Sequence, residues 1–151
     1  TMTTPGLVGV ITGGASGIGR ATVERFAAIG DRVVIADANE AAAKTVAEEM
    51  RGLAVTIDIS DSSSVADGVA HVVNALGPIE VLVNNAGIVL QGAPLIELPV
   101  DVFDKVVSVN FRGTFMMTQV VGKHMVDAKT RGAIVNVSSI GARQPTPGLG
   151  H

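Results

Sequence analysis

Small residues gather directly after the first apolar run of the chain, in a pattern suited to binding phosphate groups. The run from Leu7 to Thr12 leads into an amphipathic segment that ends at Ile29, so the expected order is strand, turn and helix. Unpaired backbone N–H groups and the positive end of the helix dipole would favour a pyrophosphate over such a turn. The residues of this turn and helix start that are predicted to form the binding site are Gly13, Ser16, Gly17, Ile18 and Gly19.

Glycine is expected in this turn because side chains would block the approach of a phosphate group. Gly13 and Gly14 would permit the tight turn. Gly17 would let the backbone come close to the phosphates, and Gly19 would let the helix pack against the strand. A plain structural turn stays open as the alternative on the glycine pattern alone.

A carboxylate follows the second apolar run, which extends from Arg32 to Ala36 and reads as a buried strand. Asp37 comes directly after it and could accept hydrogen bonds from ribose hydroxyls, whereas it would repel a 2′-phosphate. Ala38 follows, and the glycine-rich turn offers no Arg or Lys, so we predict NAD in preference to NADP as the cofactor. The alternative is that Asp37 caps the helix expected from Asn39 to Met50.

Strand-like runs alternate with helix-like runs along the whole chain, which is typical of right-handed parallel crossovers. The expected strands are Leu7 to Thr12, Arg32 to Ala36, Leu53 to Ile57, Ile79 to Val83 and Gly132 to Ser138. The expected helices are Gly17 to Ile29, Asn39 to Met50, Ser62 to Leu76, and a long one from Pro99 to Asp127 with a bend near Gly113. Ser60 or Asp61 would cap the third helix. No linker or repeat interrupts the pattern, so we predict one α/β domain, or part of one.

The composition agrees with a compact α/β domain, since 47% of the residues are hydrophobic and 17% are charged. The formal net charge is -3 and no basic run occurs, so we expect neither a nucleic acid nor an anionic membrane as partner. The chain has no cysteine, and we predict no metal site. The start has no signal-type segment and no apolar run is long enough to span a bilayer, so we expect a cytoplasmic protein.

Further motifs extend the pattern and carry a resemblance to a known family. They are TGGASGIG at Thr12 to Gly19, NNAG at Asn84 to Gly87, Asn110, and IVNVSS at Ile134 to Ser139. In this order and spacing the chain resembles the short-chain dehydrogenase/reductase family over essentially all of residues 1–151. The resemblance implies a three-layer Rossmann-type fold with a doubly wound parallel sheet, of which this chain would supply five of about seven strands. It also implies hydride transfer between nicotinamide and an alcohol or carbonyl substrate, such as a 3-oxoacyl thioester or a small alcohol.

The resemblance assigns cofactor contacts at the ends of the third and fourth strands. Asp58 and Ile59 would contact adenine, through the carboxylate and a backbone amide respectively. Read without the family, Asp58 could instead begin the turn before the next helix. The backbone that would pass beside the ribose consists of Asn85, Ala86 and Gly87. Asn84 is expected to tie neighbouring strands together, since a buried amide needs hydrogen-bond partners.

The resemblance also assigns two residues of a catalytic relay. Ser139 matches the family's active serine and is preferred over Ser138, because family members place that serine last in the NVSS run. It would hydrogen-bond the substrate oxygen. Asn110 matches the asparagine that holds a water through its side chain and bent backbone, with an ordinary helix asparagine as the alternative.

The family's catalytic Tyr and Lys have no counterpart here, since the chain contains no tyrosine and the Tyr position would directly follow His151. Lys123 and Lys129 precede the serine and do not replace the Lys, and nothing obvious would orient His151 as a proton donor. We expect the chain to be the N-terminal part of a domain of roughly 250 residues, and to be inactive by itself. A non-catalytic NAD-binding module is the alternative if it truly ends at His151.

The long helix carries more apolar side chains than one face of a sheet normally buries. They are Val106, Phe111, Phe115, Met116, Val120 and Met125. The resemblance implies that such helices pair, so we expect a homodimer or homotetramer through residues 99–127. The alternative is that all six side chains face the core of their own protomer, and periodicity does not decide between the two.

Overall fold

The apolar runs form one parallel sheet in the computed structural model, which describes residues 6–144 and 146–148. Its strands are β1 (Val8–Thr12), β2 (Arg32–Asp37), β3 (Leu53–Thr56), β4 (Val81–Asn84) and β5 (Ala133–Asn136). They lie in the order β3-β2-β1-β4-β5, and every neighbouring pair is parallel. The strand order therefore reverses direction between β1 and β4. In sheets of this kind, the carboxyl ends of the strands at the reversal open into a crevice that binds ligands.

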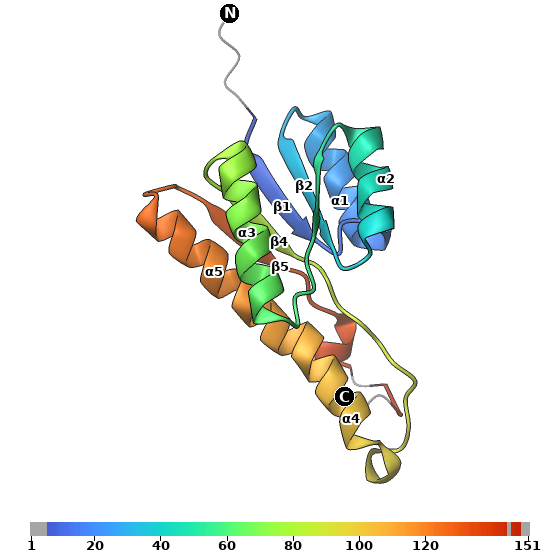
Figure 1. Cartoon of the computed structure of the whole chain (residues 1–151). Helices are drawn as coiled ribbons and strands as arrows, with labels where there is room; N and C mark the ends of the chain where they lie inside the picture. Colours follow the sequence, from blue (N-terminus) through green and yellow to red (C-terminus); the bar gives the residue numbers. More distant parts are fainter. Residues whose placement is uncertain (1–5, 145, 149–151) are drawn as a thin grey trace, which may run out of the picture.

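Helices cover both faces of the sheet, as predicted for a three-layer fold (Figure 1). α1 (Gly17–Ala28) and α2 (Glu40–Met50) lie on one face, and α3 (Ser62–Leu76) and α5 (Thr114–Asp127) lie on the other. Successive side chains of a strand point to opposite faces. Accordingly, Val10 packs in the core cluster under α3 and α5, and Ile11 packs in the cluster under α1 and α2.

The long helix predicted from Pro99 to Asp127 contains an irregular segment in its middle. It consists of α4 (Val100–Val106), a π-helical segment η2 (Val107–Gly113) and α5. Gly113, near which a bend was predicted, is the last residue of this π-helical segment. π-helical turns, in which the backbone bonds join residues i and i+5, are rare and frequently lie at functional sites.

All five strands differ from their predicted bounds, three of them by a single residue and two, β4 and β5, by more. β4 begins at Val81 and ends at Asn84, whereas the sequence predicted Ile79 to Val83. β5 ends at Asn136, because β4, its only partner among the described residues, ends opposite it at Asn84. The following residues, predicted to continue the strand to Ser138, instead lead into the short 3-10 helix η3 (Ile140–Ala142).

The apolar side chains of the long helix divide between the core and the surface. Val106, Met116 and Met125 are buried, and Val120 packs against the same core cluster. In contrast, Phe111 is 76% exposed and Phe115 is 58% exposed. The alternative that all six side chains face the core of their own protomer is therefore wrong.

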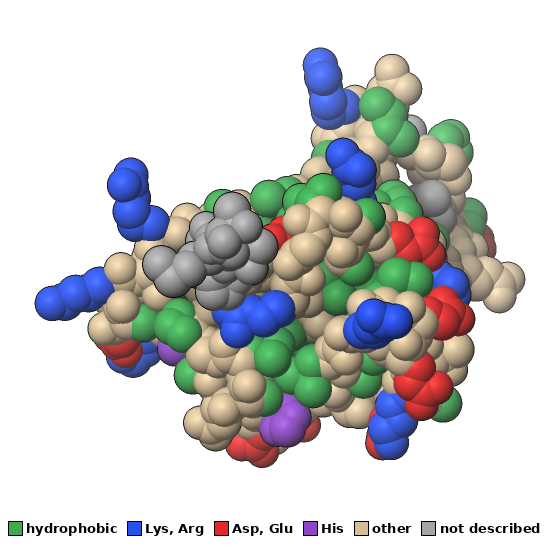
Figure 2. Space-filling view, turned by 90° about the horizontal axis from the view of Figure 1, so that it is seen from above, with side chains coloured by type: hydrophobic (Ala, Val, Ile, Leu, Met, Phe, Trp, Pro, Cys, Tyr) green, Lys and Arg blue, Asp and Glu red, His purple; other side chains and the backbone are tan. Residues whose placement is uncertain are grey.

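Charged side chains are dispersed on the end of the molecule at which β1 begins. Figure 2 shows Lys and Arg side chains standing singly there, between acidic, hydrophobic and other groups. In the part of the chain that the structure describes, no helix is both long and apolar enough to cross a bilayer.

Candidate functional site

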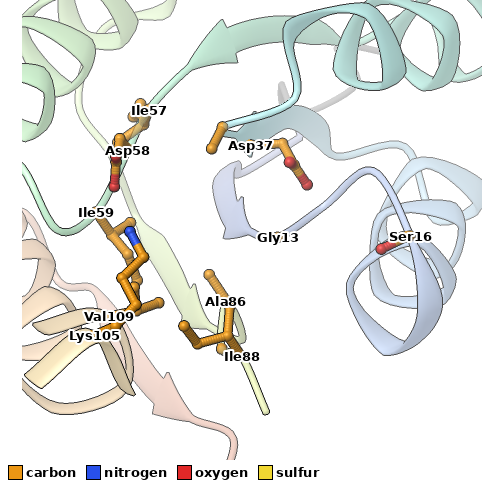
Figure 3. A pocket seen from close by; sticks show the side chains of 12 residues that line it. Gly13, Ser16, Asp37, Ile57, Asp58, Ile59, Ala86, Ile88, Lys105 and Val109 are labelled. Atoms are coloured by element: carbon orange, nitrogen blue, oxygen red, sulfur yellow. The ribbon is translucent and has the colours of Figure 1, made fainter. Parts of the chain in front are cut away.

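A cavity of about 320 Å³ opens at the carboxyl ends of the strands. Figure 3 shows that it has two walls and a floor. The glycine-rich turn and the end of β2 form one wall, the segment after β3 and the long helix form the other, and the segment after β4 lies between them. Its lining residues are Gly13, Ser16, Asp37, Ala38, Ile57, Asp58, Ile59, Ala86, Gly87, Ile88, Lys105 and Val109. Residues far apart in the sequence are thus brought together at the crevice predicted by the strand order.

The N-terminus of α1, which faces this cavity, has no side-chain cap. Asn39 caps α2 by accepting from Ala42 N–H at 3.1 Å, and Asp61 caps α3 in the same manner. Ser16 occupies the equivalent position of α1 in an extended conformation, and its side chain makes no capping hydrogen bond. The first N–H groups of a helix have no intrahelical partner, so those of α1 are free to bind an anion.

Two glycines lie at this N-terminus and have different roles. Gly17, the first residue of α1, has φ +50, and a Cβ built there would meet nothing within 4 Å. Gly19 lies against the turn itself, since its Cβ would stand 2.0 Å from Gly13 O. The predicted contact of Gly19 with the strand is therefore a contact with the turn after the strand, and any side chain at Gly19 would force α1 away from it.

Asp37 joins the two segments that form the first wall. Its Oδ2 accepts from Ala15 N–H at 3.1 Å, and its Oδ1 accepts from Asn39 N–H at 2.9 Å. The alternative that Asp37 caps α2 is wrong, because Asn39 is the cap. Each carboxylate oxygen retains a lone pair beside the cavity, so Asp37 is able to accept further hydrogen bonds from a ligand.

Asp58 lies on the opposite wall, where it also shapes the turn that it begins. Its Oδ1 accepts from Ser60 Oγ at 2.6 Å and from Ser60 N–H at 2.9 Å. These two bonds, with a smaller contribution from the positive charge of Lys105, lower the pKa of Asp58 below its ordinary value. Figure 3 shows Lys105 beside Ile59, across the cavity from Asp37 and Ser16. Asp58 therefore both forms this turn and lines the cavity.

Hydrogen bonds of Thr12 and Asn85 hold the segment after β4 against β1. The buried Thr12 Oγ1 accepts from Asn85 N–H and Ala86 N–H, both at 3.0 Å, and donates to Val83 O at 3.4 Å. Asn85 Nδ2 in turn donates to Thr12 O at 3.0 Å. Asn84 donates to Asn136 Oδ1 and Thr118 Oγ1, both at 2.9 Å, so it ties β4 to β5 as expected.

A second cavity, of about 530 Å³, adjoins the first and shares the lining residues Ala86, Gly87 and Ile88 with it. It brings Asn110, Ser138 and Ser139 together with Ile18 at the start of α1. Ser139 Oγ accepts from Gly141 N–H at 3.1 Å. Within the described ranges no acceptor is found for the Ser139 hydroxyl hydrogen, which leaves that hydrogen available to a ligand.

Asn110 lies in the π-helical segment and binds the backbone of the segment after β4. Its Oδ1 accepts from Ile88 N–H at 2.8 Å, and its Nδ2 donates to Ile88 O at 2.8 Å. One hydrogen on Nδ2 and one lone pair on Oδ1 remain for a further partner. The water-holding role predicted for this side chain stays a prediction.

Several lining residues were not predicted from the sequence. Lys105 and Val109 belong to the long helix, and nothing in their local pattern indicates that they line a cavity with Asp37 and Asp58. Thr12 lines neither cavity, and its hydrogen bonds to the segment after β4 were not predicted either. His151 lies outside the described residues. Among the residues described, no group of three or more His, Cys, Asp or Glu side chains is placed to hold a metal ion.

The chain belongs to the short-chain dehydrogenase/reductase family, since the family model described as short chain dehydrogenase matches residues 8–151. A sorbitol dehydrogenase of Cereibacter sphaeroides is 36% identical over 141 residues, which are 92% of this chain and 55% of that protein. A 3-oxoacyl-[acyl-carrier-protein] reductase FabG of Thermotoga maritima is 38% identical over 148 residues, which are 95% of this chain and 59% of that protein. The chain spans about half the length of the curated relatives that it matches.

A solved structure confirms the predicted architecture. The crystal structure of a 3-ketoacyl-(acyl-carrier-protein) reductase from Brucella melitensis, complexed with NADH, matches with a TM-score of 0.90 at 38% identity. The match covers 95% of this chain and 62% of that chain. The predicted family and the predicted α/β Rossmann-type sheet are both confirmed. Members of the family bind a nicotinamide cofactor.

Proposed function

We propose that this chain is the cofactor-binding part of an NAD-dependent oxidoreductase that interconverts an alcohol and a carbonyl compound. The observation that carries the proposal is the uncapped N-terminus of α1, which opens onto a cavity whose far side holds Asp58 and Ile59. A second cavity with Ser139 and Asn110 adjoins it. A dinucleotide is an elongated ligand with a pyrophosphate in the middle, so two adjoining cavities beside a helix N-terminus suit it.

The residues of the first cavity would hold the adenosine half of the cofactor. The first N–H groups of α1 would bind the pyrophosphate, and the Asp37 carboxylate would accept hydrogen bonds from the ribose hydroxyls. Asp58 and Ile59 would contact the adenine, and the backbone of Asn85, Ala86 and Gly87 would pass beside the ribose of the cofactor. NAD is favoured over NADP because the only cation lining the cavity within the described residues, Lys105, lies across from Asp37.

The residues of the second cavity would act on the substrate. The bound nicotinamide supplies the hydride chemistry. The Ser139 hydroxyl would donate a hydrogen bond to the substrate oxygen, and Asn110 would keep the segment at Ile88 in place beside it. The described lining of this cavity holds no residue that titrates near neutral pH, so the group that exchanges a proton with the substrate oxygen is not part of it.

We base the proposed substrate class on the relatives, which include a sorbitol dehydrogenase and a 3-oxoacyl-[acyl-carrier-protein] reductase. A secondary alcohol or its ketone is common to both. A non-catalytic NAD-binding module is the second candidate, since no residue that titrates near neutral pH is found among the described residues that line the second cavity. Detectable oxidation of an alcohol by the purified chain with NAD would exclude this second candidate.

Direct binding measurements test the proposal. Titration of the purified chain with NADH, followed by nicotinamide fluorescence, should give saturable binding that free NAD displaces. NADPH should bind at least about tenfold more weakly, because its 2′-phosphate would meet the Asp37 carboxylate. Equal affinity for both reduced cofactors would overturn the assignment of NAD, and the absence of binding by either would overturn the proposed function.

We further propose that two copies of the chain pair through the long helix. Phe111 and Phe115 are exposed and four residues apart, so they form one apolar patch near the junction of the π-helical segment and α5. Covering two aromatic side chains on each of two copies would remove several hundred square ångströms of apolar surface from water, on the order of 150–250 Å² for each side chain.

A further inference from the structure

The π-helical segment is joined to the loop that carries Asp58 by a hydrogen bond outside both cavities. Arg112 Nη1 donates to Ser60 O at 2.9 Å. Ser60 is the residue whose hydroxyl and N–H both bind the Asp58 carboxylate. The Arg112 guanidinium therefore binds the backbone of Ser60, and the hydroxyl and N–H groups of Ser60 orient the Asp58 carboxylate.

Close contact at the next residue supports the same junction. A Cβ at Gly113 would lie 2.7 Å from Ile59 Cγ1 and 2.9 Å from Ile59 O, so this loop lies directly on the helix backbone. Ile59 is 5% exposed and belongs to the main core cluster. Arg112 and Gly113 thus hold consecutive residues of one loop against the long helix.

The helix and the loop that meet at this junction also form one wall of the first cavity. Asp58 and Ile59 come from the loop, and Lys105 and Val109 come from the preceding turns of the same helix (Figure 3). The opposite wall, with Gly13, Ser16 and Asp37, belongs to other elements. A change at Arg112 should consequently displace one wall and leave the other in place.

We infer that Arg112 is a positioning residue for the adenosine half of the cofactor site. It acts by holding the Asp58–Ser60 turn against the π-helical segment, and it does not itself line either cavity. The inference rests on the proposed function, because it presumes that the first cavity receives the adenosine half of a dinucleotide. It also implies that the second cavity, with Ser139, should be insensitive to the loss of this hydrogen bond.

The test compares ligands that carry different halves of the cofactor. Binding of NADH, adenosine monophosphate and nicotinamide mononucleotide would be measured by calorimetry and ligand-observed NMR on the unaltered protein and on Arg112→Met. Arg25→Met is the matched control, since Arg25 is also exposed and no hydrogen bond of its side chain is found among the described residues. Arg112→Lys and Gly113→Ala complete the set, and thermal unfolding verifies that each variant is folded.

Arg112→Met should raise the Kd of NADH and of adenosine monophosphate by the same factor, about threefold to tenfold, which corresponds to one net hydrogen bond. Nicotinamide mononucleotide should bind unchanged, Arg112→Lys should recover part of the loss, and Arg25→Met should have no effect. Gly113→Ala should weaken the binding of the same two ligands, because the added methyl group pushes Ile59 away.

Two results would overturn the inference while the proposed function stands. One is an unchanged Kd of adenosine monophosphate in Arg112→Met although the unaltered protein binds it. The other is an equal rise in the Kd of nicotinamide mononucleotide, which would mean a general loss of structure. If the unaltered protein bound neither NADH nor adenosine monophosphate, the proposed function itself would fail, and the inference with it.

Discussion

The side chain of Asn110 pairs with both backbone groups of Ile88, through an accepted and a donated hydrogen bond of 2.8 Å each. The pairing reproduces the way in which two strands exchange bonds, although one partner is a side chain in a π-helical segment. It fixes the segment after β4, which both cavities share, to the long helix. Asn110 thus holds this backbone segment in place even when no ligand is bound.

Asn110→Ala should loosen that segment and weaken cofactor binding. Two hydrogen bonds are lost at an exposed position, so we expect the free energy of unfolding to fall by about 1–2 kcal/mol. Urea unfolding monitored by circular dichroism, together with NADH titration, measures both effects. Asn110→Asp is the informative control, because it keeps the acceptor for Ile88 N–H and loses the donor to Ile88 O. Unaltered stability in both variants would contradict the importance of the pairing.

Asp37→Ala should change the cofactor preference. The variant loses the carboxylate proposed to bind the ribose hydroxyls, so the Kd of NADH should rise about tenfold or more, and the discrimination against NADPH should decrease. The variant also frees Ala15 N–H and Asn39 N–H, which Asp37 binds. Asp37→Asn, which keeps a carbonyl oxygen for one of them, separates this structural effect from the charge effect. An unchanged ratio of NADH to NADPH affinity in both variants would remove Asp37 from cofactor selection.

Ser139→Ala should affect turnover and leave cofactor binding intact. The hydroxyl is proposed to bind the substrate oxygen, so kcat should fall at least about tenfold in a form of the protein that turns over a substrate. NADH affinity should stay nearly the same, because the hydroxyl is proposed to bind the substrate oxygen and not the cofactor. Ser138→Ala serves as the comparison, since both serines line that cavity. A larger loss of kcat in Ser138→Ala would transfer the role to Ser138.

Ser60→Ala should raise the pKa of Asp58 towards the ordinary value, since the Ser60 hydroxyl is the main cause of its lowering. A carboxyl group whose pKa is lower in the folded than in the unfolded protein stabilises the fold at pH values above its unfolded pKa. That contribution is lost as the pH falls through the lowered pKa. Carboxyl carbon chemical shifts followed by NMR over acidic pH give the titration directly.

The matched control for this titration is Ser63→Ala, which removes the corresponding hydroxyl partner of Asp61. It should raise the pKa of Asp61 and leave that of Asp58 in place. If each variant shifted the pKa values of both carboxyl groups equally, the shifts would come from a general change in the loop and not from these hydrogen bonds.

Replacing Phe111 and Phe115 together by Ser should convert the proposed dimer or tetramer to smaller species. Removing two exposed aromatic side chains has little effect on the protomer core, so thermal unfolding of the protomer should change little. Light scattering after size-exclusion chromatography gives the mass of each species. Ile29→Ser, which alters an exposed apolar residue at the end of α1, should leave the mass unchanged. A monomeric unaltered chain would contradict the pairing.

The sequence predicts local features well where one segment suffices to specify them. The alternation of apolar runs and amphipathic segments predicted all five strands, and of the two residues expected to cap α3, Ser60 or Asp61, the structure shows Asp61 as the cap. The glycine-rich turn and Asp37 also fall where predicted, because the carboxyl ends of parallel strands meet at one edge of a sheet.

Features that depend on contacts between distant segments were not predictable from the sequence. Lys105 was not expected in the cavity, since its place depends on how the long helix packs beyond the edge of the sheet. The pairing of Asn110 with Ile88 and the bond from Arg112 to Ser60 likewise join segments far apart in the chain. β5 was predicted too long because the length of a strand is limited by its partner, which apolar runs do not reveal.

The π-helical segment from Val107 to Gly113 fixes the rotational phase between the two halves of the long helix. A π turn holds about one residue more than an α turn, and each residue of an α-helix advances the direction of the side chain by about 100°. Deleting one residue here would therefore rotate Lys105 and Val109 relative to α5, away from the cavity that they line. The same deletion in the surface loop before α4 would be absorbed locally. During divergence of related sequences, insertions and deletions should accordingly collect in that loop and be absent from the π-helical segment.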